Sequence, residues 1–193
     1  MKSSTNLTKS FTTQQKWREW LGKNHSRSDG IWLRIFKKDS GKKTVTHDEA
    51  LDEALCFGWI DGQRNKHDEV SFLQKFTPRR ARSIWSKRNR EKTAKLIKEG
   101  RMTPAGLAEI ERAKKDGRWD RAYDSPKNME VPADFLEELK KSNQAYEFFK
   151  TLNKTNKFAI AFRLHTAKRP ETRARRIHES IALLAAGKKL GLK

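Results

Sequence analysis

The residues best suited to bind a ligand gather in one segment, residues 75–92. This segment holds eight Lys or Arg residues and one acidic residue, Glu91, which gives it a local charge of +7. Guanidinium groups form paired hydrogen bonds with phosphate or carboxylate, and an indole ring can stack on a nucleobase. We therefore expect an anionic partner to contact Arg79, Arg80, Arg82, Trp85, Lys87 and Arg88. The alternative is a solvated helix face with Trp85 turned into the core.

A second basic cluster lies near the C-terminal end of the sequence. On a helix that begins at Pro170, the residues Arg169, Arg173 and Arg176 follow the spacing i, i+4, i+7 and share one side. We expect Arg173 and Arg176 to contribute to anion binding as well. The same helix carries an apolar stripe, so it would bind an anion through its basic side and pack against the core through its apolar side.

One acidic residue, Asp61, has a setting that suggests catalysis. It lies between Trp59 and Gly62 at a strand edge, where burial would raise its pKa and let it act as an acid or base. The pocket would then consist of Trp59, Asp61, Gln63, Thr77, Arg79 and Ser86, with Arg79 holding a carboxylate or phosphate. The favoured interpretation of Asp61, however, is a turn aspartate that bonds neighbouring amides or pairs with an arginine. The sequence favours a non-enzymatic binding protein and leaves an enzyme or small-ligand-binding protein as the second hypothesis.

The sequence predicts no metal site and no cofactor. The five histidines are scattered without ligand spacing, and there is no glycine-rich phosphate loop or nucleophile elbow. Residues 47–49 (His-Asp-Glu) could suggest a metal cluster, but a capping box of Thr46 and Glu49 explains them better. Cys56 is the single cysteine, which excludes an internal disulfide, and its apolar neighbours predict a buried, inert thiol.

Composition points to an anionic partner. The chain of 193 residues has a formal net charge of +20, which favours nucleic acid, anionic lipid or an acidic protein. A basic surface with no dedicated partner is the alternative. The first residues lack the apolar core of a signal peptide, and no apolar run is long enough for a membrane helix. We therefore expect a cytoplasmic protein without a transmembrane segment.

The pattern of elements predicts an α+β fold: a small antiparallel sheet packed with helices, followed by an all-helical C-terminal subdomain. Strands are expected at residues 30–36, 60–63 and 70–76, with a hairpin loop at 64–69 and a strand end at the Thr-Pro pair 77–78. The expected organisation is a flexible N-terminus (1–11), an α+β domain (12–117), a connection (118–130) and a helical subdomain (131–193).

Four strings resemble the YdeI/OmpD-associated (OmdA-like) bacteriocin-protection family of bacteria. They are EALDEALCFGWIDGQ, QKFTPRRARSIWSKRN, GRMTPAGLAEIERAKKDGRW and AKRPETRARRIHESIALLAAGKK, and the similarity extends from about Trp17 to Lys188. The resemblance implies a cytosolic bacterial protein linked by name to bacteriocin protection and envelope stress. It implies no particular set of catalytic or ligand residues. A stress or immunity factor that acts through a protein partner is a third hypothesis.

Overall fold

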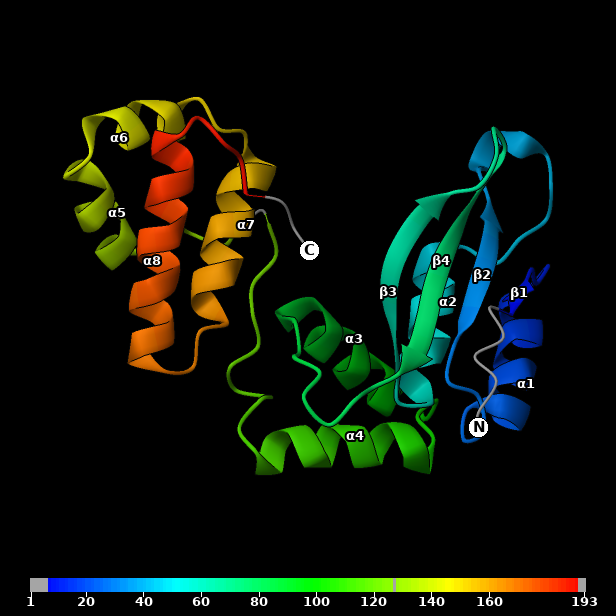
Figure 1. Cartoon of the computed structure of the whole chain (residues 1–193). Coiled ribbons are helices and arrows are strands. Elements are labelled where there is room, and N and C mark those ends of the chain that lie inside the picture. Colours follow the sequence, from blue (N-terminus) through cyan, green and yellow to red (C-terminus); the bar gives the residue numbers. More distant parts are fainter. Residues whose placement is uncertain (1–6, 127, 191–193) are drawn as a thin grey trace, which may run out of the picture. The chain divides into compact units, whose positions relative to one another are not determined.

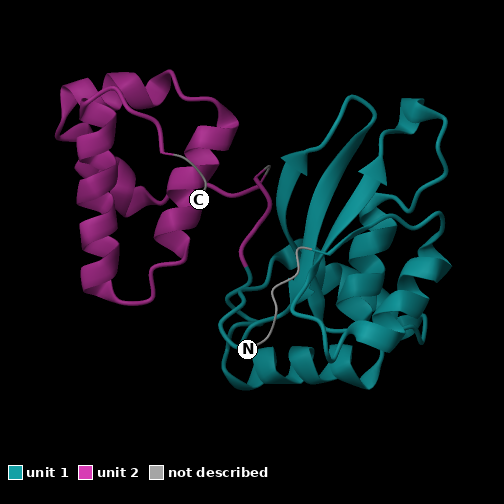
Figure 2. Ribbon diagram, turned by 45° about the vertical axis from the view of Figure 1, so that its right-hand side comes forward, with its two compact units in different colours: residues 1–122 teal, residues 123–193 magenta. Residues whose placement is uncertain are grey.

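The chain folds into two compact units. The computed structural model describes residues 7–126 and 128–190. The units comprise residues 1–122 and residues 123–193 (Figure 2), and the division between them falls inside the segment expected to be a connection. Part of the N-terminus expected to be flexible, residues 1–6, lies outside the described residues. In the remaining part, residues 7–11, Leu7 and Phe11 pack against the core of the first unit.

The first unit is built on a four-stranded sheet (Figure 1). Its strands are β1 (Thr8–Lys9), β2 (Ile31–Phe36), β3 (Trp59–Lys66) and β4 (Ser71–Pro78), in the order β1-β2-β4-β3. Strands β2, β4 and β3 pair in antiparallel fashion as expected, whereas the short β1 pairs in parallel with β2. The sheet is therefore mixed, because two polar residues near the N-terminus add a strand that their composition did not predict.

The β3–β4 hairpin is longer than the sequence predicts. Strand β3 continues through Arg64, Asn65 and Lys66, which were expected to form the loop. These polar residues are compatible with a strand because β3 is at the edge of the sheet, where one side faces solvent. Strand β4 likewise reaches Pro78, which pairs with Trp59 at the end of the ladder, a position that tolerates proline.

Four helices complete this unit: α1 (Gln14–Asn24), α2 (His47–Cys56), α3 (Lys87–Lys98) and α4 (Pro104–Lys115). A hydroxyl group accepts a hydrogen bond from the first turn of each, supplied by Thr13, Thr46, Ser86 and Thr103 respectively. The predicted capping box of Thr46 and Glu49 is confirmed. A short 3₁₀ helix, η1 (Lys38–Ser40), follows β2.

The core of the first unit lies between one face of the sheet and the helices. Trp17, Leu21, Ile31, Leu33 and Phe76 are fully buried there. At the C-terminal end of α2, helix α4 approaches so closely that a Cβ atom on Gly106 would lie 2.3 Å from the Cys56 carbonyl oxygen. Only glycine fits this position. The contact sets the position of the start of α4 against the end of α2.

The described part of the second unit contains four helices, α5 (Ala133–Lys140), α6 (Asn143–Lys150), α7 (Lys154–His165) and α8 (Pro170–Ala185). It has its own core, with Phe135, Leu139, Leu164 and Leu184 fully buried. The α+β class with helices at the C-terminal end is thus confirmed. Among the described residues, no helix combines the length and apolar character needed to cross a membrane.

Candidate functional site

The loop that joins β4 to α3 is anchored by a buried arginine. The Arg79 guanidinium carbon lies 3.6 Å from the ring centroid of Trp85, and Arg79 Nη1 donates a hydrogen bond to the Ile84 carbonyl oxygen at 3.2 Å. The backbone N–H of Arg79 donates to the Gly58 carbonyl oxygen at 3.0 Å. Both side chains are buried, at 5% exposure for Arg79 and 1% for Trp85. Arg79 and Trp85, which were expected to contact a partner, are thus both buried and have contacts inside the protein.

A second buried arginine, Arg118, fixes the other side of the loop. Its Nη1 donates to the Ser83 carbonyl oxygen at 2.7 Å, while its Nε donates to Asp116 Oδ2 at 2.7 Å. This ion pair lowers the pKa of Asp116 below its ordinary value. Two guanidinium groups thus hold consecutive carbonyl groups of the loop, those of Ser83 and Ile84. The loop is therefore held in one conformation although it has no regular structure.

Beyond Trp85 the stack continues to the surface. The rings of Trp85 and Trp119 meet edge to face with their centroids 4.9 Å apart. The Arg90 guanidinium carbon lies 5.1 Å from the Trp119 ring, and Arg90 Nη1 donates to the Trp119 carbonyl oxygen at 3.0 Å. Arginine and tryptophan therefore form one continuous row of cation–π and edge-to-face contacts, Arg79–Trp85–Trp119–Arg90, which we call the Arg–Trp stack. Its buried end is at Arg79.

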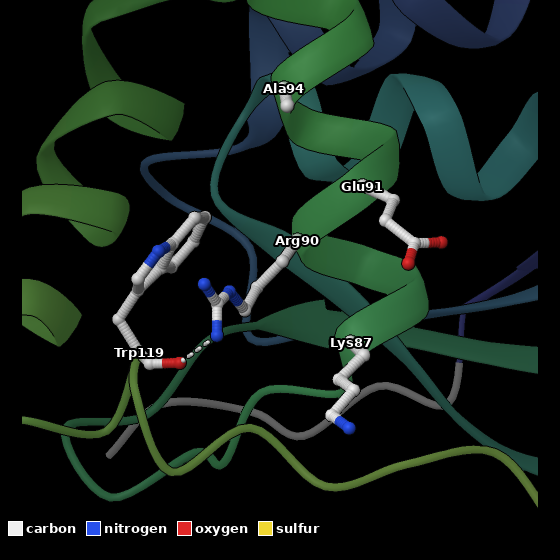
Figure 3. A pocket seen from close by; sticks show the side chains of 5 residues that line it. All are labelled: Lys87, Arg90, Glu91, Ala94 and Trp119. Atoms are coloured by element: carbon white, nitrogen blue, oxygen red, sulfur yellow. Dashed lines mark hydrogen bonds between the residues drawn. The ribbon is translucent and has the colours of Figure 1, made fainter. Parts of the chain in front are cut away.

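A pocket opens at the outer end of this stack (Figure 3). It has a volume of about 430 Å³ and is lined by Lys87, Arg90, Glu91, Ala94 and Trp119. Figure 3 shows Arg90 reaching from α3 toward the indole of Trp119, whereas the side chains of Lys87 and Glu91 extend away from it. Sequence reasoning missed Trp119, which it placed in a connecting segment, because no local pattern marks it as part of a site.

Exposed cations surround the start of α3. Arg80, Arg82, Lys87 and Arg88 are exposed, and together with Arg90 we call them the α3 basic surface. The first turn of α3 has no acidic residue, so cationic side chains lie next to the positive end of the helix dipole. This arrangement disfavours the isolated helix and creates a strongly positive region. Four of the residues predicted to contact an anion are therefore exposed in the loop before α3 and in its first turn.

Arg88, in the α3 basic surface, has an acidic neighbour. Arg88 Nη2 lies 2.8 Å from Asp48 Oδ1, and Lys92 Nζ lies 3.0 Å from Asp48 Oδ2. The hydrogen bond from Lys92 is the main reason why the pKa of Asp48 is lowered. Arg88 and Asp48 are both 60% exposed, so their ion pair is weak and readily exchanged for a phosphate.

The C-terminal arginines have internal partners instead. Arg173 binds Asp134 through two hydrogen bonds, from Nε at 2.6 Å and from Nη2 at 2.8 Å, and this contact lowers the pKa of Asp134. Its Nη1 donates to the Leu164 carbonyl oxygen at 3.0 Å. Arg176 donates to the Arg163 carbonyl oxygen and to Thr166 Oγ1. Both arginines, which were expected to bind an anion, join α8 to neighbouring helices.

Several residues of the expected Asp61 pocket have contacts elsewhere. Arg79 is turned toward Trp85, Ser86 caps α3, and the buried Trp59 donates from Nε1 to the His25 carbonyl oxygen at 3.2 Å. Gln63 is exposed and Thr77 is half-buried. The structure instead brings His47 to Asp61, with Nε2 3.1 Å from Oδ2. In the described part of the chain, neither side chain is hydrogen-bonded to a hydroxyl or thiol group that could act as a nucleophile.

A buried ion cluster that the sequence did not reveal links α1, α2 and the end of α3. Glu53 is only 2% exposed, and its carboxylate accepts hydrogen bonds from Gln14 at 2.7 Å, Arg18 at 2.6 Å and Arg101 at 2.6 Å. Burial, followed by the charge of Glu53, raises the pKa of nearby Cys56 to about 11. The adjoining pocket has a volume of about 500 Å³. Its guanidinium groups are already bonded to Glu53, so it suits an anion less well than the α3 basic surface.

Comparison with protein families gives two matches. Residues 9–109 match a model described as a domain of unknown function (DUF8412), and residues 128–187 match the model described as bacteriocin-protection, YdeI or OmpD-associated. The second match agrees with the resemblance seen in the sequence but covers less of the chain, since two of the four resembling strings lie within the first model. Searches of the curated proteins and of the solved structures gave no match.

Proposed function

The chain belongs to the DUF8412 family, whose model matches more than half of it, and it carries a C-terminal bacteriocin-protection, YdeI or OmpD-associated domain. We propose that the protein is non-enzymatic and binds an anionic partner through the α3 basic surface. The observation that carries this proposal is the separation of the basic segment into buried and exposed arginines. Arg79 and Arg118 hold the loop from inside, while Arg80 and Arg82 project into solvent.

This construction suits a binding surface for physical reasons. A loop that is already held by buried hydrogen bonds loses little conformational freedom when it binds, so less of the interaction energy is spent on ordering it. The net charge of +20 attracts an anionic macromolecule over a distance and accelerates its encounter with the surface. The partner that these features fit best is nucleic acid, whose backbone offers a row of phosphates.

The proposal is tested by measuring the affinity of the purified protein for labelled oligonucleotides at increasing salt. The test variant replaces Arg80, Arg82 and Lys87 by alanine. The control variant removes three exposed cations elsewhere, Lys23, Lys98 and Lys115, and has the same net charge. We expect the test variant to bind more weakly than the control. An equal loss of affinity in both variants would show only a general charge effect and would contradict the proposal. Binding to an acidic protein without binding to nucleic acid would indicate a protein partner instead.

A second candidate function, an enzyme or small-ligand-binding protein, has one observation in its favour. The 3.1 Å contact between His47 Nε2 and Asp61 Oδ2 is the geometry in which a carboxylate orients an imidazole for acid–base chemistry. Asp61→Asn keeps the size of the side chain and removes its charge. A metabolite conversion or ligand signal that disappears in this variant would favour the second candidate, whereas an unchanged signal would remove Asp61 from it.

A further inference from the structure

The sheet of the first unit has one face that its helices do not cover. Figure 1 shows α2 behind the strands. The burial of β2 alternates accordingly: Ile31, Leu33 and Ile35 are buried, whereas Trp32 and Phe36 are half-buried. Neither Trp32 nor Phe36 packs against the buried core of the unit. We call the face that bears them the open sheet face.

Two aromatic rings on this face are a specific arrangement. Trp32 and Phe36 are four residues apart on β2, so they lie on the same side and about 13 Å apart along the strand. Rings at this spacing can each take a separate planar group. The face therefore offers two stacking positions in line.

Cations lie beside both rings. Lys75, which pairs with Trp32 across the strands, has its Nζ 5.1 Å from the Trp32 ring centroid. The Arg34 guanidinium carbon lies 4.6 Å from the centroid of the Phe36 ring, and Lys42 Nζ lies 5.0 Å from the same centroid. An exposed cation–π contact contributes about 0.5–1 kcal/mol, whereas a base stacked on an aromatic side chain contributes about 1–3 kcal/mol. Exchange of the cation for a base is therefore favourable, and the displaced cation can then meet a phosphate.

We infer that the open sheet face binds single-stranded nucleic acid, with bases stacked on Trp32 and Phe36 and the phosphate backbone held by Lys42 and Lys75. Arg34 keeps its ion pair with Asp68, whose Oδ2 lies 2.6 Å from Arg34 Nη2. This inference deepens the proposed function and rests on it for the anionic nature of the partner. The occupant is a single strand because stacking on a flat sheet requires unpaired bases, which a duplex does not expose. Strand β4 leads from Lys75 into the loop that bears Arg80 and Arg82. A single nucleic-acid strand bound to the open sheet face could therefore continue to the α3 basic surface.

The test compares the affinity of the full chain for a labelled oligothymidylate of about 16 nucleotides with its affinity for a duplex of the same length. Trp32→Ala is expected to weaken single-strand binding roughly 5- to 150-fold, the loss of one stacked base, and to leave duplex binding unchanged. Trp32→Phe retains a ring and is expected to restore most of the affinity. Leu107→Ala, which trims an exposed apolar side chain on α4, is the control for a general surface effect.

The results separate this inference from the proposed function. If Trp32→Ala and Phe36→Ala bind the single strand as well as the original protein does, the inference is wrong, even where the Arg80, Arg82 and Lys87 variant has lost affinity. If that charge variant binds normally while Trp32→Ala does not, the proposed function fails and the open sheet face alone carries binding. Binding to vesicles of anionic phospholipid without binding to the oligothymidylate also overturns the inference.

Discussion

Arg79 lies against the face of Trp85, with its guanidinium carbon 3.6 Å from the ring centroid, and both side chains are buried. This contact changes the meaning of the most basic segment of the chain. The arginine that follows Thr-Pro holds the loop from within, and the arginines after it reach solvent. Charge density along the sequence does not distinguish these two roles, since Arg79 and Arg80 are neighbours of the same type.

Arg79→Ala is expected to destabilise the first unit by about 2–4 kcal/mol, because it removes a desolvated cation–π contact and a charged hydrogen bond to the Ile84 carbonyl oxygen. Arg80→Ala is the matched control, and as an exposed change it is expected to stay within about 0.5 kcal/mol. Urea unfolding followed by tryptophan fluorescence measures both, since all six tryptophans lie in the first unit. Equal free energies of unfolding for the two variants would contradict the buried role of Arg79.

Glu53→Gln is expected to destabilise the same unit by about 2–3 kcal/mol. The change leaves the guanidinium groups of Arg18 and Arg101 facing each other without the carboxylate that both bind. Breaking a fully buried pair costs about 3–5 kcal/mol, and the figure is lower here because the two arginines are about one third exposed. Glu111→Gln, which removes an exposed ion pair with Lys114, provides the control. A loss no larger than that of the control would show that the cluster contributes little.

The contact between Asp134 and Arg173 predicts an acid sensitivity of the second unit. Because the contact lowers the pKa of Asp134 in the folded state, its stabilising effect is present above the ordinary aspartate value of about 4 and is lost as the pH falls through the lowered pKa. Both side chains are partly exposed, so the effect is about 0.5–1 kcal/mol. Far-UV circular dichroism during urea unfolding reports it.

Asp134→Asn is expected to lower stability near neutral pH and to remove this part of the acid dependence. Glu137→Gln, an exposed change on the same helix, serves as the control. An unchanged pH profile in the Asp134 variant would show that the acid dependence has another origin.

Cys56 is expected to resist thiol reagents as long as the first unit is folded. Its side chain is buried, and a pKa of about 11 leaves about one thiolate in a thousand at pH 8. The labelling rate should therefore follow the unfolding of the unit, and addition of urea should release fast labelling. Labelling of the native protein at the rate of a free thiol would contradict the buried position.

The fold was largely predictable because its signals are local. The capping box of Thr46 and Glu49 and the β-branched and aromatic composition of β2 depend on residues close in the sequence, and they place α2 and β2 correctly. Strand β1 was not predictable, because Thr8 and Lys9 form a strand only through pairing with Trp32 and Leu33. The length of β3 has the same origin, since its polar end is held by a partner strand and not by its own composition.

The site was predictable only in part. The sequence located the basic segment, but the direction in which each side chain points is set by contacts with distant residues. Trp119 and Arg118 reach the loop from after α4, and Asp134 reaches Arg173 from the beginning of α5. Such pairings leave no periodic or spaced pattern in a single sequence, so exposed and buried arginines look alike there.

The most direct test of the account is the salt dependence of oligonucleotide binding by the variant that lacks Arg80, Arg82 and Lys87. Each phosphate contact with a single strand contributes a slope of about −0.7 to a plot of log affinity against log salt concentration. We predict that the slope of this variant is smaller in magnitude by about 2 than the slope of the control variant lacking Lys23, Lys98 and Lys115. Identical slopes for the two variants would contradict the assignment of the α3 basic surface as the anion-binding surface.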